Sequence, residues 1–130
     1  FPLKHEALES LVRSALQEDG AFNDLTTIAT VVSDRRSRAP LTARATGVIC
    51  GVPLALEAFR QLDPNVSIRI DHEDGTHVRA GGPVLFVTGH ARGLLSADRV
   101  ALNFMCHMSG IATATAGVVE AAVSVKIDAA

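Results

Sequence analysis

The chain has 130 residues, 48% of them hydrophobic, and a formal net charge of −2. This length suits one domain with a single core and leaves little room for a second. The small net charge argues against a broad polyanion-binding surface, the absence of tryptophan and tyrosine argues against base stacking, and no apolar run is long enough to span a membrane. We therefore expect neither nucleic acid nor a membrane as a partner.

The first predicted element is an amphipathic helix over Lys4–Gln17, where apolar residues recur at spacings of three and four. We expect it to end near Glu18-Asp19-Gly20, because glycine suits the left-handed conformation that closes a helix. The polar segment 23–27 favours a turn, since short polar side chains bond to nearby backbone. A ligand-binding loop is the alternative for this segment.

An arginine-rich segment comes next. Arg35, Arg36 and Arg38 stand beside a proline, a pattern that we interpret as a solvated loop, with a phosphate site as the alternative. The following segment, Leu41–Cys50, is rich in β-branched residues and predicts a strand that bends at Gly47.

The middle of the chain predicts a helix and two further strands. Val52–Leu62 has a proline suited to a first helical turn and predicts a short helix packed on a sheet. Val66–Ile70 alternates between apolar and polar residues, which predicts a strand with its apolar side chains facing the core: Val66, Ile68 and Ile70. Turns at 72–75 and 81–82 lead to an apolar strand over Val84–Val87. These elements predict the fold class α+β, a small mixed sheet with packed helices.

The longest stretch without proline, Leu94–Val119, predicts a long helix. One apolar arc is expected to face the core: Leu94, Ala97, Ala101, Phe104, Met105, Met108 and Ala112. A polar strip on the opposite side contains Ser96, Arg99, Asn103 and Gly110, flanked by the apolar residues Leu95, Val100 and Leu102. These apolar flanking residues require a second surface to cover them, and Arg99 then needs an anionic partner, because desolvating an unpaired guanidinium is costly. Arg99 is therefore the candidate binding residue, for a carboxylate or a phosphate.

The other reactive side chains favour structural roles. Cys50 and Cys106 lack metal-ligand spacing and are expected to be small core residues with free thiols. His107 lies off the polar strip and is expected to be an interface or core histidine, because it has no paired base. No metal-ligand pattern is formed by the other histidines, His5, His72, His77 and His90. We assign no catalytic residue and no metal ligand.

The two ends of the chain carry further expectations. Residues 1–15 lack the basic start and apolar centre of an export signal, which favours a cytoplasmic location. Val123–Ile127 predicts the beginning of a strand for which no partner follows, since the chain stops at Ala130. This pattern suggests a fragment of a longer protein.

Several sequence blocks together resemble the N-terminal region of the quinolinate phosphoribosyltransferase family. They are LQEDG with DLTT, ATGVICGVPLALEAF with LDP, EDGTHVRAGGPVLFVTGHARGLLSADRVALNF, and MSGIATATA. The resemblance implies an open-faced α/β sandwich over residues 1–110, followed over 111–130 by the start of an α/β barrel that is missing here. It also implies an enzyme of NAD biosynthesis that makes nicotinate mononucleotide, pyrophosphate and CO₂ from quinolinate and phosphoribosyl pyrophosphate.

The resemblance also implies roles for partners and residues. Family members are dimers in which the arginine matching Arg99 reaches into the neighbouring subunit to bind the anionic substrate, and Asn103 could support it. Mg²⁺ would enter with phosphoribosyl pyrophosphate in the intact enzyme, with no cofactor held by this chain alone. We expect the 130-residue chain alone to be inactive. The alternatives are a stand-alone dimerising interaction module and the molybdenum-transport-associated homologue of the same family.

Overall fold

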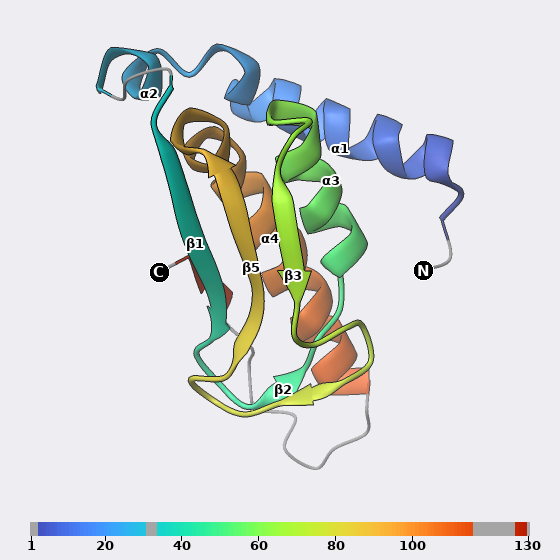
Figure 1. Ribbon diagram of the computed structural model, residues 1–130. Coiled ribbons are helices and arrows are strands. Elements are labelled where there is room, and N and C mark those ends of the chain that lie inside the picture. The colour runs from blue at the N-terminus through green and yellow to red at the C-terminus, as the bar shows by residue number, and fades with distance from the viewer. Residues whose placement is uncertain (1–2, 31–33, 116–126, 130) are drawn as a thin grey trace.

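The computed structural model describes residues 3–30, 34–115 and 127–129. A four-stranded sheet, in the order β3-β5-β1-β6, has α1, α3 and α4 on one face (Figure 1). A two-stranded sheet, β2-β4, lies at one end. The predicted α+β class is confirmed, but the predicted mixed sheet is wrong in detail, because every described strand pairing is antiparallel.

Helix α1 (His5–Asp19) confirms the first predicted helix. Its buried face consists of Leu8, Val12 and Leu16, and Gly20 closes it in the left-handed conformation at φ 73°. Two short helical elements follow where a turn was predicted, η1 (Ala21–Asn23) and α2 (Leu25–Thr30). Asp24 accepts hydrogen bonds from the Thr27 backbone N–H at 3.2 Å and hydroxyl at 2.7 Å, so it caps α2 rather than forming an isolated turn.

Strand β1 (Arg36–Ala43) begins within the segment that was predicted to be a loop. The arginine triplet is not a loop, because Arg36 and Arg38 lie in β1, which pairs with β5 (Pro83–His90). The guanidinium carbon of Arg38 lies 4.8 Å from the centre of the Phe86 ring on β5, so the cation packs on an aromatic side chain while the residue stays exposed.

The predicted strand over Leu41–Cys50 is interrupted. β1 ends at Ala43, and the two-residue strand β2 (Gly47–Val48) pairs instead with β4 (His77–Val78). The Ala43 backbone is held by the 81–82 turn: its N–H donates to the Gly82 carbonyl at 3.0 Å, and its carbonyl accepts the Gly81 N–H at 2.7 Å. The chain therefore leaves the main sheet before Gly47 rather than bending at it.

Helix α3 (Val52–Leu62) has the predicted bounds. Strand β3 (Ser67–Ile70) pairs with β5 at the edge of the sheet. Val66 and Ile68 pack against the core as predicted, whereas Ile70 is 36% exposed and the prediction that it faces inward is wrong. Ile70 ends an edge strand, where β5 is its one described neighbour.

Helix α4 (Ala91–Thr115) begins directly after β5, three residues before the predicted start at Leu94. The Ala91 N–H donates to the Arg35 carbonyl at 2.8 Å, which satisfies one of the backbone donors at the new helix start. The predicted core arc is buried at Leu94, Ala97, Ala101 and Met105 and half-buried at Phe104, Met108 and Ala112. The predicted end at Val119 lies outside the described residues.

The last described strand is β6 (Ile127–Ala129). It pairs antiparallel with β1, Leu41 opposite Ala129 and Ala43 opposite Ile127. The prediction of a strand without a partner is therefore wrong, because β1 offers an open edge at these residues. Positions 123–126 lie outside the described part of the chain.

Two hydroxyl groups of the SGIAT segment fasten α4 to the β2 region. Ser109 accepts the Cys50 N–H at 2.9 Å and lies 3.0 Å from the Cys50 carbonyl, to which its hydroxyl donates. One turn later, Thr113 accepts the Val48 N–H at 3.0 Å and donates to the Ser109 carbonyl at 2.7 Å. The fully buried Ser109 hydroxyl thus supplies the hydrogen bonds that a neighbouring strand would otherwise make to the Cys50 backbone.

Replacing Ser109 with alanine is expected to lower the free energy of unfolding by about 1–2 kcal/mol, because it leaves buried backbone groups of Cys50 unpaired. Urea denaturation followed by circular dichroism measures this change. Ser10→Ala, on an exposed position of α1, is the matched control and should have little effect. Equal stability of the Ser109 and Ser10 variants would contradict the fastening role.

Candidate functional site

Arg99 stands beside a hollow of about 340 Å³ between the end of α1 and the first turns of α4. The hollow is lined by polar and small residues: Asp19, Gly20, Ala21, Asn23, Asp24, Leu95, Ser96, Asp98 and Arg99. Three of these are carboxylates, so acidic groups outnumber the single arginine. The fold brings them together from segments that are far apart in the sequence.

The Arg99 side chain is 75% exposed. One guanidinium nitrogen, Nη1, donates to Oδ1 of Asp19 at 3.3 Å, and this is an ion pair within the chain. Exposed pairs of this kind contribute at most about 1 kcal/mol to folding. Asp19 of the same chain is thus a carboxylate partner of the exposed Arg99, and the predicted role of Arg99 in substrate binding stays a prediction.

Asp98 precedes Arg99 and is half-buried. Burial raises the pKa of its carboxyl because desolvation penalises the charged form, and the nearby charges of Asp19 and Asp24 act in the same direction. The Arg99 backbone N–H and charge partly offset these effects. Asp98 therefore belongs to the same electrostatic cluster as Arg99.

Asp24 links this cluster to α2. Its carboxylate accepts the Thr27 hydrogen bonds and the Ser96 hydroxyl at 3.1 Å, and the Thr27 side chain is the main cause that lowers the pKa of Asp24. Ser96, which was predicted on the polar strip of α4, is buried and donates this hydrogen bond from its hydroxyl. The α2 segment covers that part of α4, which periodicity along α4 alone does not reveal.

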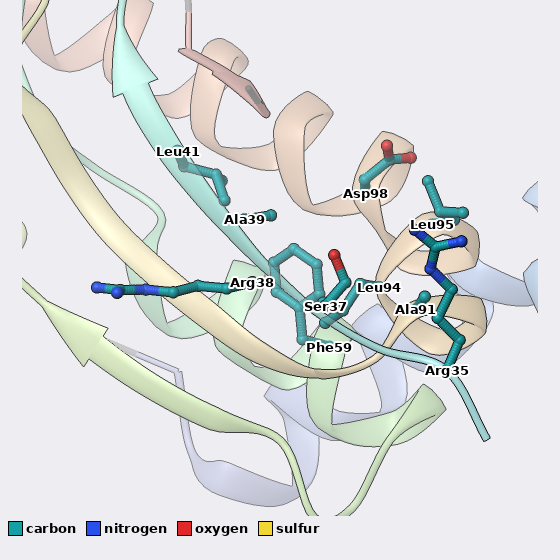
Figure 2. A pocket seen from close by; sticks show the side chains of 10 residues that line it. All are labelled: Arg35, Ser37, Arg38, Ala39, Leu41, Phe59, Ala91, Leu94, Leu95 and Asp98. Atoms are coloured by element: carbon teal, nitrogen blue, oxygen red, sulfur yellow. The ribbon is translucent and has the colours of Figure 1, made fainter.

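A second hollow, of about 400 Å³, lies between β1 and α4 (Figure 2). Leu41, Phe59 and Leu94 give it an apolar lining, and Asp98 lines this hollow as well as the first. Arg35 runs beside the start of α4, whereas Arg38 points away from that helix (Figure 2). Asp98 thus lines both hollows, and Arg35 and Arg38 line the second one together with its apolar residues.

The remaining predicted residues of the α4 surface have mixed outcomes. Asn103 is exposed one turn after Arg99, but no hydrogen bond joins these two side chains in the described part of the chain, so its supporting role stays a prediction. His107 is exposed one turn further on, which rules out the core alternative. Val100, predicted beside the strip, is buried, whereas Leu95 is 49% exposed.

The structure describes no further candidate site for a metal ion or a membrane within residues 3–30, 34–115 and 127–129. These residues contain no group of three or more His, Cys, Asp or Glu side chains arranged to hold a metal ion. Cys50 and Cys106 are half-buried and are not joined by a disulfide. Within the same ranges, no helix combines the length and the apolar character that a membrane crossing requires.

Sequence reasoning missed Asp19 and Asp98 as members of the site. Asp19 sits in the acidic-Gly end of the first helix and Asp98 adjoins Arg99, so both signals were visible. Their proximity was not, because Asp19 and Arg99 are 80 residues apart. The one cationic side chain that lines this hollow is the exposed Arg99, so Arg99 is the lining residue suited to bind an external anion.

Comparison with known proteins gives a consistent family. Residues 24–109 match the family described as quinolinate phosphoribosyl transferase, N-terminal domain. A chloroplastic nicotinate-nucleotide pyrophosphorylase (carboxylating) of Oryza sativa subsp. japonica is 40% identical over 116 residues, which cover 88% of this chain and 31% of that protein. The corresponding protein of Mycobacterium leprae is 42% identical over 121 residues, covering 89% of this chain and 42% of the relative.

Solved structures agree with this relationship. NadC from Streptococcus pyogenes has a TM-score of 0.84 and 32% identity, covering 89% of this chain and 41% of that one. The nicotinate-nucleotide pyrophosphorylase from Francisella tularensis has a TM-score of 0.81 and 33% identity, covering 87% and 40%. The chain therefore spans less than half the length of the relatives that it matches.

Proposed function

The chain belongs to the quinolinate phosphoribosyltransferase family through its N-terminal domain, and we propose that it is the N-terminal part of a carboxylating nicotinate-nucleotide pyrophosphorylase. The intact enzyme would make nicotinate mononucleotide, pyrophosphate and CO₂ from quinolinate and phosphoribosyl pyrophosphate in NAD biosynthesis. The observation that carries this proposal is the family match over residues 24–109, which includes Arg99 and the surrounding α4 segment. The names of the relatives favour the quinolinate enzyme over its molybdenum-transport-associated homologue.

Arg99 would bind the anionic substrate in the neighbouring subunit of a dimer. Its exposed guanidinium supports this role, because most of the side chain is available to an external carboxylate or phosphate. Asn103, exposed one turn away, would support the arginine or the interface. Neither residue would act as a catalyst, so the reacting groups would lie in other parts of the intact enzyme.

A homodimer, or a higher oligomer built from it, would use the outer face of α4. Leu95 and Ile111 are 49% and 54% exposed on this helix, at either end of the segment that contains Arg99. Covering exposed apolar side chains with a partner removes them from water, which favours association. The same observation supports the second candidate function, a dimerising interaction module without activity of its own.

Three further assignments remain part of the proposal. Mg²⁺ would arrive with phosphoribosyl pyrophosphate, since the described residues do not supply a cluster suited to a metal. Residues 1–110 would form the sandwich and 111–130 the start of a barrel, although α4 runs unbroken through Gly110. A cytoplasmic location would suit two cysteines that are not joined by a disulfide, while relatives from rice and tobacco are described as chloroplastic and mitochondrial.

Formation of nicotinate mononucleotide from quinolinate and phosphoribosyl pyrophosphate tests the proposal. We expect turnover by the intact protein and none by the purified 130-residue chain, because Arg99 supplies binding and not the reacting groups. Sedimentation of the same samples reports the oligomeric state. No turnover by the intact protein, with a dimer still present, would favour the interaction module; turnover by the 130-residue chain would contradict its proposed dependence on other parts of the enzyme.

A further inference from the structure

We propose that Asp19 is a positioning residue for Arg99. In this arrangement Asp19 holds one nitrogen of the guanidinium, and the rest of the group faces outward toward an anion supplied from outside the chain. The inference deepens the proposed function and rests on it, because it concerns how Arg99 is prepared to bind.

The position of Asp19 is fixed by the helix that carries it. It is the last residue of α1, a helix anchored in the core by Val12 and Leu16, both fully buried. Gly20 closes the helix, and its N–H donates to the Gln17 carbonyl at 3.1 Å. The Asp19 side chain is 20% exposed, so its carboxylate is held against the domain while one side remains open.

The contact between Asp19 and Arg99 is made through one nitrogen of the guanidinium. Nη1 approaches Oδ1 of Asp19 at 3.3 Å, and the arginine side chain keeps 75% of its exposure. A guanidinium has five N–H donors in a planar fork, so a contact through one nitrogen leaves donors for a second anion. A carboxylate that competed for the whole group would be expected to engage it through two nitrogens.

The contact with Asp19 restricts the Arg99 side chain before an anion binds. Arginine has a long side chain with much rotational freedom, and binding an anion restricts that freedom. A fixed carboxylate at one nitrogen removes part of this freedom before the anion arrives, which favours binding. Asp98 and Asp24 lie in the same hollow, but neither has a side-chain hydrogen bond to Arg99 in the described residues, so Asp19 is the residue that orients it.

The test uses the intact enzyme and steady-state kinetics with quinolinate. Asp19→Ala is expected to raise the KM about two- to five-fold, the range of a single exposed ion pair, with kcat changed less than two-fold. Asp19→Glu should restore part of the lost affinity, because it returns a carboxylate to the end of α1. Glu18→Ala is the matched control: Glu18 is exposed beside Asp19 and does not line the hollow that contains Arg99, so its variant should keep the parent KM.

A double-variant comparison separates this inference from the proposed function. If Asp19 acts through Arg99, Asp19→Ala should not raise the KM further in an Arg99→Ala background. An increase of the same size in both backgrounds, or an unchanged or lowered KM for Asp19→Ala alone, would overturn the positioning role. If Arg99→Ala itself leaves the KM unchanged, the proposed role of Arg99 fails and the positioning role fails with it. Loss of folding would reduce the active fraction and so the apparent kcat, while the KM of the folded fraction would still report on Asp19.

Discussion

Replacing Arg99 with alanine in the intact enzyme is expected to lower kcat/KM for quinolinate roughly ten- to a hundred-fold. The basis is the loss of one charge-assisted hydrogen bond to an anion, about 1.5–3 kcal/mol, and each 1.4 kcal/mol corresponds to about a factor of ten. The structure makes this variant informative because Arg99 is 75% exposed and its ion pair with Asp19 contributes little to folding. A large kinetic effect with an unchanged unfolding free energy would therefore report on binding.

Two further variants sharpen this test. Arg99→Lys keeps the charge but loses the planar fork, so we expect an intermediate loss of kcat/KM. Arg60→Ala removes an exposed arginine of α3, outside the hollow that contains Arg99, and should leave the kinetics near those of the parent enzyme. Parent kinetics for Arg99→Ala would remove Arg99 from the substrate site.

Replacing Asp63 with alanine is expected to lower the free energy of unfolding by about 2–4 kcal/mol. Asp63 is 4% exposed and accepts hydrogen bonds from the backbone N–H groups of His90 at 2.8 Å and Asn65 at 3.1 Å. The His90 ring nitrogen Nδ1 lies 3.3 Å from the same carboxylate. Because His90 immediately precedes α4, the variant removes both a buried charge-assisted network and a favourable anion at a helix start. Urea denaturation at neutral pH measures the loss.

The contribution of Asp63 should also depend on pH. Burial acts to raise the pKa of its carboxyl, but the backbone and ring hydrogen bonds of His90 and the Asn65 N–H outweigh it, so the pKa lies below its ordinary value of 3.8. A lowered pKa means that the unfolded chain binds the proton more readily, so this stabilisation is complete above the unfolded-state pKa and is lost as pH falls through the folded-state pKa. The stability difference between the parent and Asp63→Ala should therefore be steady near neutrality and shrink below about pH 4.

Gly89→Ala provides an independent check on the same network. A Cβ at Gly89 would overlap Oδ2 of Asp63 and come within 3.3 Å of a Val66 methyl group, so we expect a loss of about 1–3 kcal/mol from overpacking. Asp34→Ala, at an exposed aspartate, should have little effect and serves as the control. Parent stability for both Asp63→Ala and Gly89→Ala would contradict the importance of this network.

The accuracy of the sequence predictions follows the range of the interactions involved. Helices α1 and α3 were predicted closely because their signals are local: apolar spacing, a closing glycine and an initial proline. The start of strand β1 was predicted as a loop because its arginines suggested a solvated segment, whereas Arg38 contacts Phe86, which lies on β5. That contact depends on strand pairing and leaves no periodic pattern in the arginine segment itself.

The candidate site likewise combines a residue with a local sequence signal and neighbours that come from distant segments. Arg99 could be singled out because a charge in an apolar helical pattern is conspicuous. Its actual neighbours could not, since Asp19 approaches from a helix 80 residues earlier. The burial of Ser96 could not be predicted either, because Asp24, which its hydroxyl contacts, lies 72 residues earlier. Periodicity describes one helix, whereas burial depends on what the rest of the fold lays against it.

The direct junction between β5 and α4 limits how the length of this segment can change. His90 ends the strand, Ala91 begins the helix, and the Asp63 network holds the helix start in place. An extra residue inserted between Ala91 and Arg99 would have no loop to absorb it and would turn Arg99 by about 100° around the helix axis. The number of residues between the end of β5 and Arg99 thus sets the angular position of Arg99 relative to Asp19. A single insertion or deletion here would redirect the guanidinium even if every side chain were retained.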